Sequence, residues 1–376
     1  MINFNKPHMT GHETEYIRQA VESGKISGNG EFTRRCQAFF EARYGFRKCL
    51  LTTSCTDALE MAAILTGVGP GDEVIVPSYT FVSTALAFVR TGAKIVFCDS
   101  CADNPNVDPA EIEKLITPRT KVIVPVHYAG VACDMDAIMD IARRHDLLVV
   151  EDAAQAIDSF YTSGRETVSP LKRALGSIGH LAAFSFHETK NIISGEGGML
   201  VVNDERFIRR AEIIWEKGTN RAEFFRGEVN KYGWVDIGSS FLPSEIVAAF
   251  LWAQLENLDA IQDERRRIWR AYWDGLSDLA ARGRFTLPRI PEHATNNAHM
   301  FYLVFPDLAQ RTEFIRGMKE KGIQCVFHYL ALHSSEFYLP RHDGRRLPNC
   351  DRFADCLVRL PLYFGLPVQD VIRAFA

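Results

Sequence analysis

Short runs of hydrophobic residues alternate, over the N-terminal half of the chain, with segments in which hydrophobic positions recur at helical spacing. The runs are rich in valine and isoleucine, as is typical of strands that are buried on both faces. The predicted strands cover residues 48–52, 73–77, 94–98, 121–127 and 147–151. The predicted helices between them cover residues 56–65, 80–90, 109–116 and 135–145. This order predicts an α/β fold, with a mainly parallel sheet flanked by helices.

The remaining segments lie on either side of this repeat. Helical spacing occurs at residues 10–23 and 31–43, and short strands are predicted at 184–186 and 199–202. Long helical patterns follow at 204–216 and 244–260. Toward the C-terminus, two predicted strands, 301–305 and 325–329, have a helix between them. We therefore expect a large domain over residues 1–260 and a smaller C-terminal α+β domain over residues 261–376.

Polar and aromatic residues follow several predicted strands, at the sheet edge where parallel α/β sheets bind ligands. Ser54, Cys55 and Thr56 directly precede a helix, so their hydroxyls and backbone amides can bind a phosphate. Serine and threonine are also common helix caps. Phe81 follows the strand 73–77 and can either stack on an aromatic ring or belong to the core. Taken one at a time, these residues can therefore be explained by helix capping or core packing, without a ligand.

Asp152 follows the strand 147–151, where a buried carboxylate needs a cation or several hydrogen-bond donors. The pyridinium nitrogen of pyridoxal phosphate is such a partner, because the aspartate keeps that nitrogen protonated and the ring can then accept electrons. Capping of a following helix is the alternative role for this carboxylate. Gln155, one helical turn further on, can donate to the phenolic oxygen of the same ring.

Lys190 is the candidate nucleophile. It follows the short strand at Ser185 and precedes the glycine-rich stretch Gly195-Glu196-Gly197-Gly198. A lysine amine attacks a carbonyl only when it is unprotonated, so catalytic lysines lie where burial or a neighbouring cation lowers their pKa. Taken alone, this lysine is more simply interpreted as a solvated surface charge.

Several motifs together resemble the sugar-nucleotide aminotransferase family of fold-type I pyridoxal-phosphate enzymes. They are Glu151-Asp152-Ala153-Ala154-Gln155, Phe184-Ser185-Phe186-His187 with Lys190, Gly195-Glu196-Gly197-Gly198, Val124-Pro125-Val126-His127-Tyr128-Ala129-Gly130 and Ser54-Cys55-Thr56. The resemblance spans essentially the whole chain. Within this family, residues 77–85, 216–221 and 236–240 are most similar to the transaminases that make dTDP-4-amino-4,6-dideoxygalactose.

The resemblance implies a role for each candidate residue. Lys190 would bind the cofactor covalently, Asp152 would pair with its pyridine nitrogen, and Gln155 would contact its ring oxygen. Ser185 and the backbone amides of Cys55 and Thr56 would hold the phosphate, and Phe81 would cover the ring. Many relatives place an asparagine of the neighbouring subunit on the phosphate, and here Ser240 takes that position. The resemblance thus implies at least a homodimer with shared active sites.

The implied reaction transfers an amino group from glutamate to a dTDP-linked 4-keto-6-deoxyhexose. Lys217, Arg221 and Arg226 are candidates for binding its diphosphate, or are solvated loop charges. Amination at C3 of a 3-keto sugar is the alternative reaction. Dehydrating relatives carry a histidine in place of the lysine, so Lys190 argues against dehydration. A regulatory protein that retains the fold is the non-enzymatic alternative.

Composition narrows the class further. The net charge of −4 gives no support for nucleic-acid binding, and no uninterrupted apolar stretch predicts a membrane span or a signal peptide, so we expect a cytoplasmic protein. Nine scattered cysteines suit reduced thiols better than disulfides. The spacing of His299, His328 and His333 does not predict a metal site, and we expect them to line the sugar cleft or to make hydrogen bonds in the core.

Overall fold

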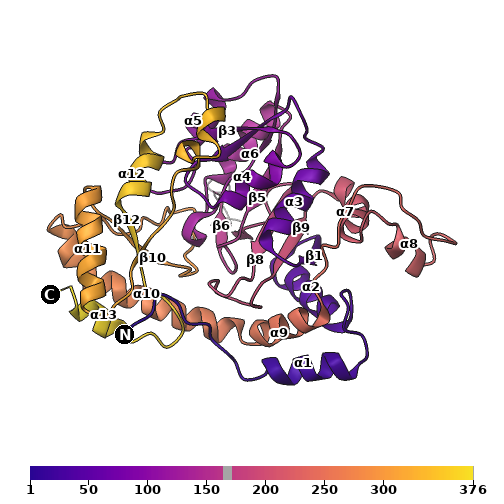
Figure 1. Cartoon of the computed structure of the whole chain (residues 1–376), viewed down its shortest axis with the longest axis horizontal. Coiled ribbons are helices and arrows are strands. Elements are labelled where there is room, and N and C mark those ends of the chain that lie inside the picture. Colours follow the sequence, from indigo (N-terminus) through magenta and orange to yellow (C-terminus); the bar gives the residue numbers. More distant parts are fainter. Residues whose placement is uncertain (164–171, 376) are drawn as a thin grey trace.

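A seven-stranded sheet forms the centre of the molecule in the computed structural model, which describes residues 1–163 and 172–375 (Figure 1). In spatial order its strands are β1 (Lys48–Thr52), β9 (Gly198–Val202), β8 (Leu181–Ser185), β5 (Leu148–Asp152), β4 (Thr120–Ile123), β2 (Glu73–Pro77) and β3 (Lys94–Cys98). Only β9 runs against its neighbours in this sheet. The mainly parallel α/β fold is therefore confirmed.

Helices cover both faces of this sheet. They are α2 (Glu31–Tyr44), α3 (Cys55–Thr66), α4 (Val82–Val89), α5 (Pro109–Lys114), α6 (Met135–Arg144) and α7 (Ile208–Trp215). Because side chains alternate along a strand, Val149 and Val150 of β5 enter two different cores. Val150 lies in the same core as Phe88 of α4, whereas Val149 lies with Ile138 of α6. Burial on both faces explains why the strands read as continuous hydrophobic runs.

The C-terminal part has its own small sheet and its own core. A long helix, α10 (Leu258–Ala281), follows α9 (Glu245–Glu256) after a break at Asn257. The antiparallel sheet has the order β10 (Phe301–Val304), β12 (Leu357–Leu360) and β11 (Val326–Phe327), and α11 (Leu308–Glu320), α12 (Pro348–Cys356) and α13 (Val368–Arg373) complete this part. The domain boundary near residue 260 stays a prediction.

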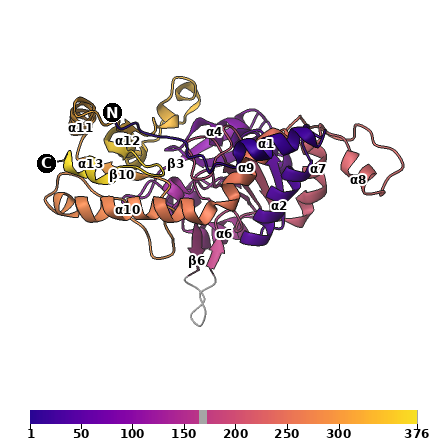
Figure 2. The ribbon, with the colours of Figure 1, turned by 90° about the horizontal axis from the view of Figure 1, so that it is seen from below.

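The outer elements give the molecule an elongated shape. An arm around α8 (Arg221–Phe225) projects at one end, and the C-terminus lies at the other (Figures 1 and 2). The N-terminal segment pairs with the C-terminal part at Ile2 and Ile323, and then leads to α1 (Glu13–Glu22). A hairpin is formed by β6 (Phe160–Thr162) and β7 (Lys172–Ala174). Among the described residues, no helix is long and apolar enough to cross a membrane.

Four local predictions were wrong. The strand expected at 121–127 ends at Ile123, the last residue of β4. The strand expected at 325–329 is only the two residues of β11, and the helix expected at 204–216 starts with a 3₁₀ turn, Glu205–Phe207, before α7. No helix follows β5, because the chain continues in turns through residues 153–159. Asp152 consequently does not cap a helix, and its Oδ1 instead accepts a hydrogen bond from the backbone of Ala154 at 3.1 Å.

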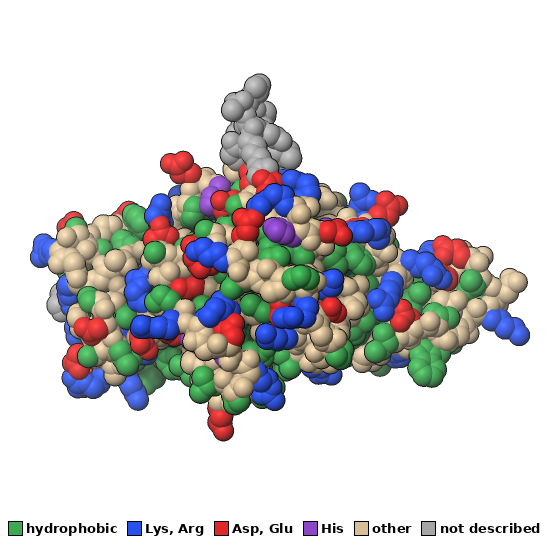
Figure 3. All heavy atoms as spheres, turned by 90° about the horizontal axis from the view of Figure 1, so that it is seen from above, with side chains coloured by type: hydrophobic (Ala, Val, Ile, Leu, Met, Phe, Trp, Pro, Cys, Tyr) green, Lys and Arg blue, Asp and Glu red, His purple; other side chains and the backbone are tan. Residues whose placement is uncertain are grey.

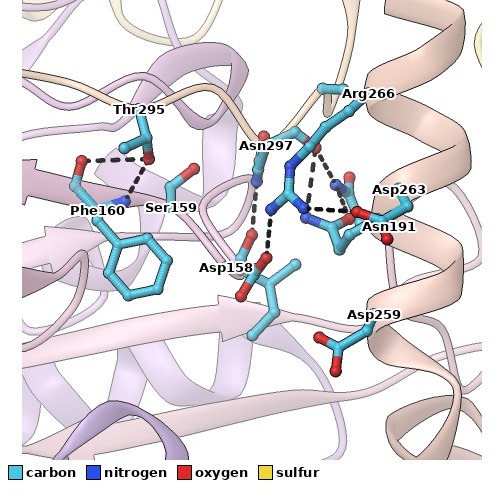
Figure 4. Close-up of polar contacts among 12 residues, drawn as sticks. Asp158, Ser159, Phe160, Asn191, Asp259, Asp263, Arg266, Thr295 and Asn297 are labelled. Carbon is cyan, nitrogen blue, oxygen red and sulfur yellow. Dashed lines mark hydrogen bonds and ion pairs between the residues drawn. The ribbon is translucent and has the colours of Figure 1, made fainter.

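Asn297 joins the C-terminal part to the segments that follow Asp152 and Lys190. Its side-chain amide donates to the backbone carbonyls of Gln155 and Ile157, both at 2.8 Å. Its backbone carbonyl accepts from the side-chain amide of Asn191 at 2.9 Å. Figure 4 shows Asn297 and Asn191 beside the ion pair of Arg266 with Asp158, whose atoms lie 2.5 Å apart. Two loops from different strands are thus held against the same residue.

Candidate active site

A cavity of about 530 Å³ opens where the carboxyl ends of β5 and β8 meet the start of α3. It is lined by all of the predicted catalytic and cofactor-binding residues except Ser240, namely Ser54, Cys55, Thr56, Phe81, Asp152, Gln155, Ser185 and Lys190. These residues come from separate loops of the sheet, and the parallel strands bring their carboxyl ends to one edge.

The carboxylate of Asp152 is fixed on both oxygens. Its Oδ2 accepts a hydrogen bond from the Thr84 hydroxyl at 2.7 Å, and Thr84 in turn contacts the Thr80 hydroxyl at 2.9 Å. The backbone amide of Ala154 donates to Oδ1. The side chain is almost fully buried yet still borders the cavity. Such a carboxylate is positioned to accept a further hydrogen bond from a protonated ring nitrogen.

The N-terminus of α3 forms a cradle of backbone amides and hydroxyls. Ser54 is the N-cap of α3, and its Oγ accepts a hydrogen bond from the backbone amide of Asp57 at 3.1 Å. The Ser54 hydroxyl thus caps the helix. Thr56 contacts Ser83 at 2.8 Å. A Cβ on Gly198 would lie 2.4 Å from the amide nitrogen of Cys55, so only glycine lets β9 approach this turn. A helix N-terminus with free amides favours an anion such as a phosphate.

Lys190 lies in the tight loop between β8 and β9, where its amide donates to the His187 carbonyl at 2.8 Å. Burial lowers the pKa of its side-chain ammonium below the ordinary value. The nearby charge of Arg359 acts in the same direction, while Cys55 and Asp152 act in the opposite one. A larger share of this amine than of an ordinary lysine amine is therefore unprotonated and able to attack a carbonyl.

Gln155 and Phe81 border the other side of the cavity. The Gln155 side chain accepts from the Ala129 amide at 2.6 Å and donates to the Tyr329 hydroxyl at 3.1 Å, so its orientation is set before any ligand binds. Phe81 is 55% exposed at the rim, with its ring centroid 6.1 Å from that of Tyr329. An exposed ring at this rim can cover a flat ligand.

Ser240 lies away from this cavity. Its backbone forms an antiparallel β-bridge with that of Glu216. Ser240 lines a second cavity of about 630 Å³, which Lys217, Arg221 and Arg226 also line. Arg226 forms ion pairs with Glu212 at 2.9 Å and Glu228 at 2.7 Å. A contact of Ser240 with the cofactor would therefore need a second copy of the chain.

Several residues of the cavity were not predicted. They include Thr80, Ser83, Thr84, His187, Glu196, Tyr329 and Arg359. His299 and His328 also line the cavity, which is one of the two places expected for them. Burial lowers the pKa of His299 and of His328 well below the ordinary value, so both imidazoles are neutral near pH 7. His333 instead bonds Ser78 at 2.8 Å. The arginine within the hydrophobic run 357–360 was the one signal that could have revealed Arg359.

The residues present fit pyridoxal phosphate. The cavity offers a desolvated lysine for its aldehyde, a fixed carboxylate for its ring nitrogen, and amides at a helix N-terminus for its phosphate. The close approach that Gly198 permits keeps the helix N-terminus against the sheet edge. Fold and cavity together define a fold-type I pyridoxal-phosphate aminotransferase.

Comparison with known proteins gives the family. The model of the DegT/DnrJ/EryC1/StrS aminotransferase family matches residues 7–376. The spore coat polysaccharide biosynthesis protein SpsC of Bacillus subtilis is 33% identical over 385 residues, covering 99% of this chain and 96% of that protein. GDP-perosamine synthase of Caulobacter vibrioides is 33% identical over 383 residues, covering 100% and 96%.

Solved structures agree with this assignment. The structure of Spr1654 from Streptococcus pneumoniae in its PMP form has a TM-score of 0.90 at 26% identity, and the match covers 100% of this chain and 98% of that one. The chain thus belongs to the DegT/DnrJ/EryC1/StrS aminotransferase family. It is a pyridoxal-phosphate-dependent sugar aminotransferase.

Proposed function

We propose that the protein transfers the amino group of glutamate to C4 of a dTDP-linked 4-keto-6-deoxyhexose, giving dTDP-4-amino-4,6-dideoxygalactose. The proposal is supported by the resemblance of residues 77–85, 216–221 and 236–240 to transaminases of that type. Phe81, in the first segment, borders the cavity that contains Lys190. Ser240, in the third segment, borders the second cavity, which Lys217, Arg221 and Arg226 also line.

Lys190 performs the proton transfers in this scheme. Bound pyridoxal phosphate supplies an electron sink that stabilises negative charge on the reacting carbon. The Nζ of Lys190 first removes the proton from the donor carbon that bears the amino group, and in the second half-reaction it returns a proton to C4 of the sugar. Asp152 holds the ring nitrogen protonated, and Thr84 keeps that carboxylate in place.

The active site is proposed to be shared between two subunits. The arm around α8 carries Phe225, 69% exposed, and Trp234, 85% exposed. Figure 3 shows hydrophobic and basic side chains together on this projecting arm. Large exposed aromatic side chains are typical of protein interfaces. In a homodimer the arm would bring Ser240 to the partner's phosphate, and Lys217 and Arg221 to the diphosphate of the sugar nucleotide.

A panel of sugar nucleotides tests the proposal. The purified holoenzyme is incubated with glutamate and, separately, with dTDP-, UDP- and GDP-linked 4-keto and 3-keto deoxyhexoses, and the products are identified by mass and NMR. We expect turnover of the dTDP-linked 4-keto sugar, with the new amine at C4. Turnover confined to a 3-keto sugar would show that the enzyme aminates C3.

A GDP-linked sugar is the second candidate substrate. It is favoured by the identity of 33% to GDP-perosamine synthase over essentially the whole chain. A kcat/KM that is higher for the GDP-linked 4-keto sugar than for the dTDP-linked one would replace the nucleotide in the proposal and leave the reaction unchanged.

A further inference from the structure

The imidazole of His299 is held at the wall of the active-site cavity by the residue that follows Lys190. His299 lies just before β10 and is only 4% exposed, yet it lines the cavity together with Lys190. Its Nδ1 lies 2.8 Å from the side-chain Oδ1 of Asn191. Because Asn191 is the neighbour of Lys190 in the chain, this contact keeps the imidazole beside the reaction centre.

The hydrogen bonds of Asn191 determine which nitrogen of the imidazole carries the proton. The Nδ2 of Asn191 donates to the backbone carbonyl of Asn297 at 2.9 Å and to Oε1 of Gln262 at 2.8 Å. A backbone carbonyl only accepts, so the atom of Asn191 that faces His299 is its side-chain oxygen. Nδ1 of His299 therefore donates to that oxygen. In the neutral imidazole, Nε2 is then an unprotonated acceptor.

The imidazole is also kept neutral and fixed in place. Burial lowers the pKa of His299 well below its ordinary value, and the nearby charges of Lys190, Arg359 and Arg265 act in the same direction. Arg265 donates to the backbone carbonyls of Ala298 and His299, at 3.1 and 2.7 Å, and so holds this segment against α10. Near pH 7, Nε2 is therefore a fixed hydrogen-bond acceptor.

This acceptor has no hydrogen-bond partner among the described residues, although His299 borders the cavity. Other polar groups of the same wall are already paired, as Tyr329 is with Gln155 and Thr84 is with Asp152. A buried acceptor without a donor is costly. The arrangement therefore indicates a ligand that donates a hydrogen bond to Nε2.

The two substrates of the proposed reaction differ in what they can donate. The amino group of glutamate is the group that is transferred, and its carboxylates only accept. A 4-keto-6-deoxyhexose has a single hydroxyl next to the reacting carbon, at C3, because C5 bears the ring oxygen and the methyl group. The C3 hydroxyl is thus the donor that the sugar brings closest to the reaction centre.

We propose that Nε2 of His299 accepts a hydrogen bond from the C3 hydroxyl of the sugar, so that the enzyme selects a 3-hydroxy sugar over a 3-deoxy sugar. Asn191 is the positioning residue, because it fixes both the imidazole and its tautomer. This assignment rests on the proposed function, in which the sugar is aminated at C4.

Binding of an unreactive sugar nucleotide measures this contact without turnover. The holoenzyme is titrated calorimetrically with dTDP-6-deoxygalactose, which has a C4 hydroxyl in place of the keto group, and with its 3-deoxy counterpart. We expect the wild type to bind the 3-hydroxy ligand about tenfold or more tightly than the 3-deoxy ligand, which leaves a buried acceptor unpaired. The kcat/KM values of the two corresponding 4-keto sugars should show the same preference.

Two variants separate this hydrogen bond from the structure of the site. In His299→Asn the side-chain amide can keep the contact to Asn191 while the Nε2 acceptor is lost, so the preference should fall to about threefold or less. His299→Gln places an amide oxygen near the position of Nε2 and should keep part of the preference. His145→Asn, an exposed change at the end of α6, is the matched control and should keep the wild-type preference.

The tautomer is observed by NMR of the nitrogen-labelled histidines in the wild type, with His299→Asn identifying the signals. We expect a protonated Nδ1 and an unprotonated Nε2 on His299. A protonated Nε2 would overturn the inference, as would equal affinity of the wild type for the 3-hydroxy and 3-deoxy ligands, and this comparison needs no variant to fold. Full preference in His299→Asn, or a loss confined to glutamate binding, would also overturn it.

Failure of the proposed function has a different signature. A wild-type holoenzyme that aminates no 4-keto sugar would show that the proposed function is wrong, and the assignment of His299 would fall with it. A wild-type holoenzyme that aminates 3-hydroxy and 3-deoxy 4-keto sugars equally well would leave the function intact and contradict the assignment of His299 alone.

Discussion

Thr84 determines how the Asp152 carboxylate is held. The two side chains are buried and 2.7 Å apart, so Thr84→Val removes one donor and adds no bulk. Loss of a hydrogen bond to a charged group costs about 1.5–3 kcal/mol. We expect pyridoxal phosphate to bind at least about tenfold more weakly to this variant, as measured by fluorescence titration of the apoprotein. Thr84→Ser keeps the hydroxyl and should bind as wild type; equal affinity of Thr84→Val would contradict the role.

The pKa of Lys190 predicts the pH dependence of cofactor uptake. Only the unprotonated amine reacts, so the uptake rate of the apoprotein should rise with pH through a midpoint below that of an ordinary lysine. Because the Asp152 charge raises this pKa and the Arg359 charge lowers it, Asp152→Asn should move the midpoint to lower pH and Arg359→Met to higher pH. Stopped-flow absorbance measures these rates. Shifts of the same sign in both variants would contradict the assignment.

At the scale of elements, β9 and the start of α3 depend on Gly198. A Cβ at this position would lie 2.4 Å from backbone atoms of Ser54 and Cys55, so Gly198→Ala must displace the turn. We expect the dissociation constant of pyridoxal phosphate to rise about tenfold or more. Gly317→Ala, in α11 where a Cβ meets nothing within 4 Å, is the control. Unchanged cofactor affinity in Gly198→Ala would show that the turn does not bind the phosphate.

Most strands of the large sheet could be predicted because each is a short hydrophobic run, often rich in valine and isoleucine, between clear breaks. The bounds of β1, β2 and β3 match the predicted residues 48–52, 73–77 and 94–98. Near the cavity, prediction was weaker. Gln155 lies in a turn rather than a helix, and Arg359 reaches the cavity only because β12 pairs with β10 and β11. Such positions depend on contacts between distant segments, which no local pattern contains.

At the scale of the whole molecule, the shared site predicts complementation between two inactive variants. Lys190→Ala lacks the nucleophile, and Ser240→Asp places a negative charge against the partner's phosphate. In a mixed dimer one site carries both changes and the other carries neither. After refolding a 1:1 mixture we expect about a quarter of the wild-type activity. Ser240→Asn, the residue of many relatives, should remain active. No recovery in the mixture would argue against a shared site.

The location of the covalent bond to the cofactor tests the account most directly. The holoenzyme is reduced with borohydride and digested, and the labelled peptide is identified by mass spectrometry. The account predicts a single phosphopyridoxyl group on Lys190, and its loss in Lys190→Ala, with the fold unchanged by circular dichroism. A label on another lysine, or a protein that takes up pyridoxal phosphate without labelling Lys190, would contradict it.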